Sequence, residues 1–343
     1  MKIAVDAMGG DLAPGEIVKG ALMAAKAYNQ AIILVGDEDK IRAELGNNNP
    51  GDLISIFHAP EVITMDEHPA AAVKRKKNSS IVRATQLVKE GEASALVSAG
   101  NTGAAMASAL LGLGRIRGID RPAIASVMPS ETGSTVVLDV GANVDCKPQN
   151  LLQFGVMGYL YAHMILGVKN PRVGLLSNGE EETKGSELTL AAYQLLKNAG
   201  INFIGNVEGR DIFRGTVDVV VCDGFVGNIV LKSSEGLAVA LYNTLKEEIE
   251  QSWMAKAGIL MAAKALMKFK KRIDYAEYGG APLLGVNGVS IICHGRSNAK
   301  AVQNGVRVAI EAVENSLVSA IFDSIHKNDY MEEVDVNLAQ RSV

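Results

Sequence analysis

The sequence predicts an α/β fold with a doubly wound, mostly parallel sheet. Six short runs rich in β-branched apolar residues each end in a small polar cluster, and each run has the length and composition of a buried strand. Stretches rich in helix formers lie between most of these runs, so strands and helices alternate along the chain. The composition agrees with this class, because 35 glycines accompany 48% hydrophobic and only 5% aromatic residues.

The predicted strands are the β-branched runs bounded by Gly, Asp or Asn. They cover residues 2–5, 32–35, 53–57, 95–97, 124–127, 135–138, 172–176, 202–204, 217–221 and 289–292. The predicted helices cover residues 14–28, 80–89, 103–111, 148–166, 186–198, 227–250 and 298–322. Pro14 and Pro148 suit first turns, where a missing N–H costs nothing. Ser79 suits a cap for the helix from residue 80, as Asn101 or Thr102 does for the helix from residue 103.

The chain length favours two subdomains, because a single core stops growing at about 250–300 residues. No Pro/Ser-rich linker or repeat divides the 343 residues. We therefore expect one unit over residues 1–343 with two intertwined subdomains, one formed by residues 1–120 with 286–330 and the other by residues 121–285.

Composition and motifs exclude several classes of protein. The three cysteines are widely spaced and form no CxxC pair, which argues against a disulfide framework and a zinc site. Met1 leads directly into the first predicted strand, and no uncharged apolar stretch of about 18 residues is present. No HExxH, GxSxG, P-loop or GxGxxG sequence occurs. We expect a cytoplasmic protein without metal, cofactor or nucleic-acid partner.

A basic apolar segment covers residues 251–273, which hold six cations and no acidic residue although the net charge of the chain is −4. Its mixture of aromatic and aliphatic residues with lysines is typical of a helix that lies on an anionic membrane. A dimer interface or a core helix is the competing interpretation. The residues that we expect to dock on the membrane are Trp253, Ile259, Leu260, Lys264, Leu266, Lys268 and Phe269.

The polar clusters are candidates for one binding site, because the carboxyl ends of parallel strands meet at one edge of a sheet. Residues 98–103 form the best phosphate cradle, since two glycines, a hydroxyl and an amide lie where a strand passes into a helix. Asn101, Thr102 and Gly103 would bind the phosphate. An ordinary turn that caps the helix is the alternative.

Two further groups of cations could neutralise a phosphate. Lys184 follows a buried strand and precedes a helix, although three neighbouring glutamates make a solvated salt-bridged loop equally plausible. Residues 74–77 are four consecutive cations before Ser79 and Ser80, which suits a phosphate or an acidic partner. A loop that only keeps the protein soluble is the alternative there. His294 could donate a proton or a hydrogen bond at a strand end, and the cysteines fit packing roles.

Seven motifs occur in an order that resembles one family: KIAVDAMGGD, KRKKNSS, VSAGNTGA, LDVGANVDCKP, LSNGEEETKG, CDGFVGNIVLK and ICHGRSN. They resemble the bacterial phosphate acyltransferases, the acyl-carrier-protein:phosphate transacylases of phospholipid synthesis. The resemblance covers nearly the whole chain. It implies a fold like those of isocitrate/isopropylmalate dehydrogenases and phosphotransacetylases, a homodimer, and peripheral membrane association. It also implies conversion of long-chain acyl-ACP and inorganic phosphate to acyl phosphate, which a membrane glycerol-3-phosphate acyltransferase consumes.

That reaction demands neither a metal nor a covalent nucleophile, because phosphate is nucleophilic and a thiolate leaves readily, so positioning and charge neutralisation should dominate. We expect three groups of site residues. The catalytic group is Lys184, His294 and Asn228. The phosphate-binding group is Asn101, Thr102, Gly103, Ser79 and Ser80. The residues that organise the site are Asp6, Gly9, Gly10, Asp11, Asn143, Asn178 and Asp223.

Three other functions compete with this interpretation. A phosphotransacetylase-like enzyme would use short acyl-CoA at the same site. A hydroxyacid dehydrogenase of the related fold would need a nicotinamide nucleotide, for which no fingerprint is readable. A membrane-bound scaffold for carrier protein would perform no chemistry.

Overall fold

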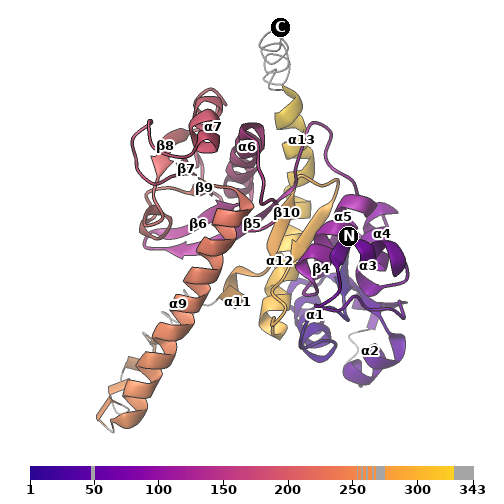
Figure 1. Ribbon diagram of the computed structural model, residues 1–343. Helices are drawn as coiled ribbons and strands as arrows, with labels where there is room; N and C mark the ends of the chain where they lie inside the picture. Colours follow the sequence, from indigo (N-terminus) through magenta and orange to yellow (C-terminus); the bar gives the residue numbers. More distant parts are fainter. Residues whose placement is uncertain are drawn as a thin grey trace.

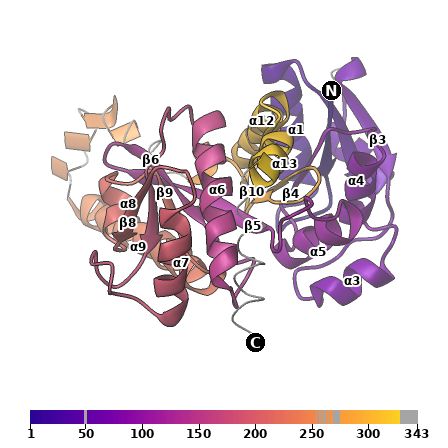
Figure 2. The ribbon, with the colours of Figure 1, turned by 90° about the horizontal axis from the view of Figure 1, so that it is seen from above.

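One large sheet runs through the molecule, and it is mostly parallel as predicted (Figure 1). The computed structural model describes residues 1–47, 51–252, 254–255, 258–259, 262–264, 266–267 and 275–327. Within these ranges the sheet has 11 strands in the order β3-β2-β1-β4-β11-β10-β5-β6-β9-β7-β8. Figure 2 shows the two halves of the molecule beside each other, with β10 and β5 between them.

The first half contains five parallel strands. They are β1 (Lys2–Asp6), β2 (Ala31–Gly36), β3 (Ile54–His58), β4 (Ala95–Ser98) and β11 (Val289–Ile292). Its helices are α1 (Gly15–Tyr28), α2 (Glu38–Leu45), α3 (Pro69–Arg75), α4 (Ser80–Lys89), α5 (Thr102–Gly112), α12 (Ala299–Glu314) and α13 (Leu317–Lys327), with a 3-10 turn, η1 (Gly51–Leu53).

The second half contains the strands β5 (Ala123–Ser130), β6 (Gly133–Leu138), β7 (Val173–Leu176), β8 (Phe203–Val207) and β9 (Val219–Val221), and β10 (Ala281–Leu284) joins β5 to β11. Its helices are α6 (Pro148–Met164), α7 (Glu187–Lys197), α8 (Asp211–Arg214), α9 (Gly224–Gln251) and α11 (Tyr275–Tyr278). Helix α9 extends away from the body of the molecule (Figure 1).

Each face of the sheet has its own apolar core. Ile3, Val5 and Val97 join one cluster together with α1, α6 and α12, whereas Ala4 and Leu96 join the other with α4 and α5. This alternation follows from the two-residue period of a strand, which is buried on both faces here. The chain also returns on itself, since β11 pairs with β4, α12 packs on α1, and α13 contacts α6 of the second half. The exact division into subdomains stays a prediction.

The direction of the strands corrects one expectation. Three antiparallel pairings, β11 with β10, β10 with β5 and β5 with β6, lie between β4 and β6 in the sheet. Strands β6, β9, β7 and β8 therefore run opposite to β1, β2, β3, β4 and β11. The expectation that all polar clusters share one edge of a parallel sheet is wrong for this reason.

Several elements also differ from those expected. The predicted helix 298–322 is two helices, because α12 ends at Glu314 and Ser316 takes a positive φ of 53° before α13. Strand β10 and the helices α2, α3, α8 and α11 were not predicted. Pro14 lies at the N-cap of α1 and not inside its first turn, whereas Pro148 is the first residue of α6 as expected.

Candidate functional site

The carboxyl ends of β1 and β4 carry the first group of candidate residues, which we call the α5 cluster: Asp6, Gly9, Ser98, Gly100 and Asn101. Asp6 is buried at the end of β1, and its carboxylate accepts from the Ser98 hydroxyl at 2.7 Å and from the Met8 N–H at 3.3 Å. Ser98 Oγ in turn accepts from the Gly100 N–H at 3.1 Å. Burial raises the pKa of Asp6, against the opposing effect of hydroxyl donors from Ser80 and Ser98.

Three loops meet at this cluster because glycine allows close approach. A Cβ on Gly9 would lie 2.8 Å from the backbone nitrogen of Gly100. Gly10 has a φ of +112°, and a Cβ there would lie 3.1 Å from the carbonyl oxygen of Gly295 after β11. The Asp11 N–H also donates to that oxygen, at 2.8 Å. The structure thus brings together the polar clusters that follow β1, β4 and β11, as expected for parallel neighbours.

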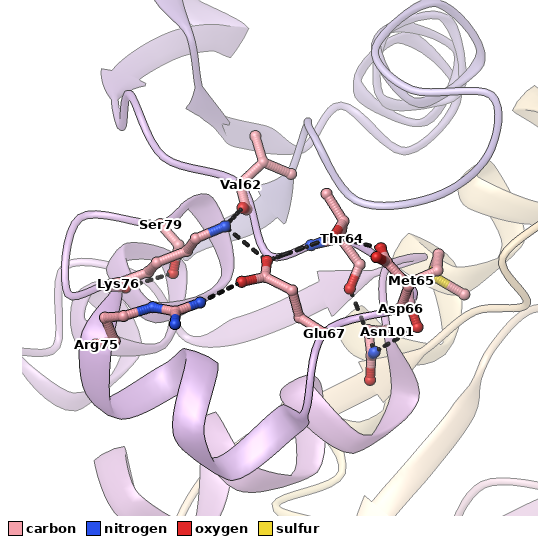
Figure 3. Close-up of polar contacts among 9 residues, drawn as sticks. All are labelled: Val62, Thr64, Met65, Asp66, Glu67, Arg75, Lys76, Ser79 and Asn101. Carbon is pink, nitrogen blue, oxygen red and sulfur yellow. Dashed lines mark hydrogen bonds and ion pairs between the residues drawn. The ribbon is translucent and has the colours of Figure 1, made fainter.

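Asn101 caps α5, as the sequence suggests, and also holds a neighbouring loop. Its Oδ1 accepts from the Ala104 N–H at 3.0 Å. Its Nδ2 donates to the carbonyl oxygens of Met65 at 3.0 Å and Thr64 at 3.4 Å (Figure 3). The whole side-chain amide is therefore engaged within the protein. Thr102 and Gly103 form the first turn of α5, where backbone N–H groups have no helical acceptor.

Two of the four cations in the basic run of residues 74–77 pair with one glutamate. Arg75 and Lys76 both contact the carboxylate of Glu67, each at 2.6 Å. Hydrogen bonds from Lys76, from the Thr64 N–H and from Arg75 lower the pKa of Glu67 to about 2. Ser79 is fully buried and its hydroxyl donates to the Lys76 carbonyl at 2.8 Å, so it forms no side-chain cap of α4, contrary to the expected cap. Ser80 is also buried. Phosphate binding by these two serines stays a prediction.

His294 lies exposed after β11, and its Nδ1 accepts from the Arg296 N–H at 3.1 Å. Arg296 in turn lies 3.9 Å from the carboxylate of Asp11. His294 thus lies at the border of the α5 cluster, on the loop that contacts Gly10. Its role in binding or catalysis stays a prediction.

A second group, which we call the α9 cluster, follows β6 and β9: Asp139, Asn143, Gly224, Gly227 and Asn228. The buried carboxylate of Asp139 accepts from the N–H groups of Ile124, Gly141, Ala142 and Asn143 and from Asn143 Nδ2, at 2.7–3.3 Å. Desolvation raises the pKa of Asp139 against these donors. Asn143 Nδ2 also donates to the Pro122 carbonyl. Asp139 therefore fixes the loop that carries the candidate Asn143.

Helix α9 begins directly against this loop. The Asp223 side chain caps α9 by accepting from the Val226 N–H at 2.9 Å, and the Gly224 N–H donates to the Asn143 carbonyl at 2.7 Å. A Cβ on Gly227 would lie 1.9 Å from the Asp139 carbonyl oxygen. The exposed Asn228 lies beside Gly141. The structure thus brings together three predicted residues, Asn143, Asp223 and Asn228.

The loop of residues 177–186, between β7 and α7, carries Lys184 and Asn178. Asn206 of β8 holds it by donating to the carbonyl oxygens of Glu181 and Lys184, at 2.8 and 3.4 Å. Among the ion pairs of the described residues, Glu180 pairs with Arg210 and Glu182 with Lys197, while Lys184 pairs with neither glutamate. Lys184 and Asn178 are both exposed. The side chain of Lys184 is thus placed to meet a ligand from solvent.

Three polar residues that hold these loops in place were not among the predicted site residues. Ser98 links Asp6 to Gly100, Asp139 organises the loop before Asn143, and Glu67 neutralises two cations of the basic run. Ser98 and Asp139 each stand where a buried apolar strand ends, which was a readable signal. Nothing near Glu67 in the sequence indicates its partners, because Arg75 and Lys76 follow eight and nine residues later.

Cysteine and the basic apolar segment add little to these clusters. Burial raises the pKa of Cys146 to about 11 and that of Cys293 to about 12, which suits packing roles.

In the described ranges we find no group of three acidic, histidine or cysteine residues suited to a metal, and no helix long and apolar enough to span a membrane. Ile259, Lys264 and Leu266 are described, whereas Trp253, Leu260, Lys268 and Phe269 lie outside the described residues.

Comparison with known proteins agrees with the fold and the motifs. A family profile described as "Fatty acid synthesis protein" matches residues 1–320. A protein of Pelotomaculum thermopropionicum named "Phosphate acyltransferase" is 72% identical over 325 residues, covering 95% of each chain. One of Geotalea daltonii with the same name is 53% identical, covering 99% of each chain.

Solved structures show the fold. A phosphotransacetylase from Streptococcus pyogenes superposes with a TM-score of 0.63 at 18% identity, covering 92% of this chain and 94% of that one. A 4-hydroxythreonine-4-phosphate dehydrogenase from Klebsiella pneumoniae gives 0.53 at 15% identity, covering 91% and 99%. The expected dehydrogenase-like fold is therefore confirmed, and the sequence matches establish that this chain belongs to the phosphate acyltransferase family.

Proposed function

We propose that the protein transfers a long-chain fatty acyl group from acyl carrier protein to inorganic phosphate, which yields an acyl phosphate. Family membership over residues 1–320 carries this proposal, because the relatives at 53–72% identity are named phosphate acyltransferases. The glycine-lined α5 cluster supports it, because backbone N–H groups at a helix N-terminus are a suitable site for an oxyanion. No cofactor takes part in the proposed reaction.

The proposed reaction is a direct displacement. A phosphate oxygen bonds to the thioester carbonyl carbon, the C–S bond breaks, and the departing thiolate takes up the proton that hydrogen phosphate releases. Negative charge develops on the carbonyl oxygen in the transition state, so nearby cations and N–H donors accelerate the reaction if they are already in place. Holding both reactants in line removes the entropic cost of bringing them together.

We assign the described residues to this reaction as follows. The N–H groups of Thr102 and Gly103 bind phosphate at the N-terminus of α5, which Asn101 caps. Ser79 and Ser80 complete the proposed phosphate-binding group. Lys184 neutralises phosphate or the thioester oxyanion, and His294 and Asn228 donate hydrogen bonds. The residues that organise the two clusters are Asp6, Gly9, Gly10, Asp11, Asn143, Asn178 and Asp223.

This assignment requires the α5 cluster and the Lys184 loop to face one ligand although β4 and β7 run in opposite senses. The twist of the sheet supports such an arrangement. Six strand pairings separate β4 from β7. At roughly 20–25° of twist per pairing, the accumulated rotation makes the directions of β4 and β7 less opposed than they would be in a flat sheet.

The partners follow from the substrates and the product. Acyl carrier protein delivers the acyl group, and a membrane glycerol-3-phosphate acyltransferase consumes the product. Release at the inner face of the cell membrane limits loss, because an acyl phosphate is hydrophobic and prone to hydrolysis. Helix α9 supports a homodimer or membrane contact, since apolar side chains along it are exposed in the chain as described: Leu237, Val239, Leu241 and Leu245.

Acyl-phosphate formation tests the function directly. Purified protein with long-chain acyl-ACP and inorganic phosphate should give a product that hydroxylamine traps as a hydroxamate. Short acyl-CoA at matched concentration should give little product, whereas preference for it would indicate a phosphotransacetylase-like enzyme. A protein that forms no hydroxamate with either donor would be a scaffold, and a nicotinamide-dependent activity would indicate a dehydrogenase.

Membrane docking is tested by placing charges in the basic apolar segment. Leu260→Glu with Leu266→Glu should remove the protein from vesicles that contain anionic phospholipid, because buried carboxylates oppose insertion into the interface. Activity on soluble acyl-ACP should stay within about 2-fold of the wild-type value, because side chains that dock on the membrane do not contact the reacting atoms. Sedimentation with vesicles measures binding. Unchanged sedimentation together with dissociation of a dimer would instead assign the segment to the dimer interface.

A further inference from the structure

The loop before α3 lies beside the N-terminus of α5, where the proposed function puts phosphate, because Asn101 donates to its Thr64 and Met65 carbonyl oxygens (Figure 3). We call residues 62–68 the strap. We propose that Lys76 and Glu67 are positioning residues that hold the strap in place and thereby set the affinity of the α5 cluster for phosphate. This inference rests on the proposed function and adds two residues that do not touch the reacting atoms.

Lys76 fastens the beginning of the strap to the loop before α4. Its ammonium donates to the Val62 carbonyl oxygen at 2.7 Å and to Glu67 Oε2 at 2.6 Å. Only 25% of its side chain is exposed, whereas the side chain of Arg75 is 69% exposed. Since its donors are directed into the strap, Lys76 is not available to a ligand. Its place in the basic run is therefore structural, whereas Lys74, Arg75 and Lys77 are exposed.

Glu67 holds the end of the strap, and two cations compensate its negative charge. Its Oε2 also accepts from the Thr64 N–H at 3.0 Å, which closes the strap into a compact turn. Lys76 and Arg75 carry two positive charges against the one negative charge of Glu67, so this group of three has a net charge of +1. That matters beside an anion site, because an uncompensated carboxylate at this position would repel phosphate. The depressed pKa keeps Glu67 ionised at neutral pH.

Asn101 joins the strap to α5. Its Nδ2 contacts the Met65 and Thr64 carbonyls while its Oδ1 caps the Ala104 N–H, so the strap and the helix start share one amide. The residue after the strap, Pro69, packs on Gly103 so closely that a Cβ on Gly103 would lie 2.5 Å from the proline ring. A shift of the strap must therefore move or release the first turn of α5.

The strap also closes one side of a small cavity in the α5 cluster. Val62 and Ile63 of the strap face this cavity, and Asp6, Ser98 and Gly100 form its other side. The binding geometry at the α5 N-terminus thus depends on groups from β1, β4 and the strap together. An error of about 1 Å in such a site weakens binding even when no contacting residue has changed.

Variants that release the strap test the proposal. Lys76→Met and, separately, the isosteric Glu67→Gln should raise the KM for inorganic phosphate by about 10-fold, while kcat and the KM for acyl-ACP stay within about 2-fold. Lys76→Arg should restore most of the phosphate affinity, because its guanidinium keeps the charge and the donors. The KM for phosphate of the double variant should be no higher than that of the more impaired single variant, because both substitutions break the same network.

A second measurement does not depend on activity. Inorganic phosphate should raise the Tm of the wild-type chain at matched ionic strength, because a ligand that binds only the folded state stabilises it. That rise should shrink in Lys76→Met. The control is Lys40→Met in α2, which breaks an ion pair of 3.2 Å with the N-cap residue Asp37. It should change neither the KM for phosphate nor the phosphate-induced rise in Tm.

The outcomes separate the inference from the function on which it rests. A lower Tm in Lys76→Met and Glu67→Gln with unchanged phosphate KM and an unchanged phosphate-induced Tm rise would overturn the positioning role and leave only a structural one. A wild-type chain that forms no acyl phosphate would overturn the function. In that case, a phosphate-induced Tm rise that depends on Lys76 would still support the strap as part of an anion site.

Discussion

Replacing Lys184 by alanine is expected to lower the rate of acyl-phosphate formation by about 100-fold, the range seen when one preorganised charge or donor is removed from a transition state. Lys184 is exposed on the loop between β7 and α7. Of the neighbouring glutamates, Glu180 pairs with Arg210 and Glu182 pairs with Lys197. The Lys184 ammonium is therefore free to neutralise phosphate or the developing oxyanion. Hydroxamate trapping under saturating phosphate and acyl-ACP measures the effect on kcat.

Two variants make this test specific. Lys184→Arg keeps the charge and should recover part of the rate. Lys197→Ala removes another lysine of the same region, one that pairs with Glu182 at 3.5 Å, and should leave the rate within about 2-fold because surface ion pairs contribute little. Normal activity in Lys184→Ala would show that the charge has no role in the reaction and that the Lys184 loop does not face the substrate.

Gly227→Ala is expected to destabilise the protein by about 4 kcal/mol, which is at the upper end of single substitutions. The added Cβ would lie 1.9 Å from the carbonyl oxygen of Asp139 and 2.9 Å from Cys222 Sγ. Neither neighbour can move away, because the first belongs to the backbone of a loop held by five N–H donors and the second is buried between β9 and α9. Urea denaturation followed by circular dichroism measures the change in free energy of unfolding.

Gly236→Ala is the matched control in the same helix. A Cβ at Gly236 meets nothing within 4 Å, so the substitution removes only the entropic disadvantage of glycine and should stabilise α9 by about 0.5–1 kcal/mol. A Gly227→Ala protein as stable as the wild type would mean that α9 does not begin against the Asp139 loop. The α9 cluster would then not exist as described.

Most strands could be predicted from the sequence because their residues are buried on both faces. The run of residues 289–292 is β11 with the same bounds, and residues 80–89 form α4 as predicted. Strand β10 was missed because its four residues include a proline and adjoin glycines, a pattern that normally argues against a strand. The break between α12 and α13 depends on a positive φ at Ser316, which no residue type there indicates.

The candidate site was likewise predictable only in part from the sequence. Gly9, Gly10 and Asn101 could be found because a polar cluster after a buried strand lies at the edge of the sheet, and β1, β4 and β11 are parallel neighbours. The relation of this group to Asn143, Asp223 and Lys184 could not be predicted. It depends on the antiparallel pairings of β10, β5 and β6, which reverse the second half of the sheet.

The sequence by itself determined the α/β class, the family and the polar clusters, because each depends on local composition and on the order of short motifs. Only the tertiary structure decided the partners of the charged groups. Lys76 serves the strap and Lys184 remains exposed, although both are lysines in charged loops before a helix. A charge is paired or free according to which distant side chains the fold brings within about 4 Å, and residue type alone does not specify that distance.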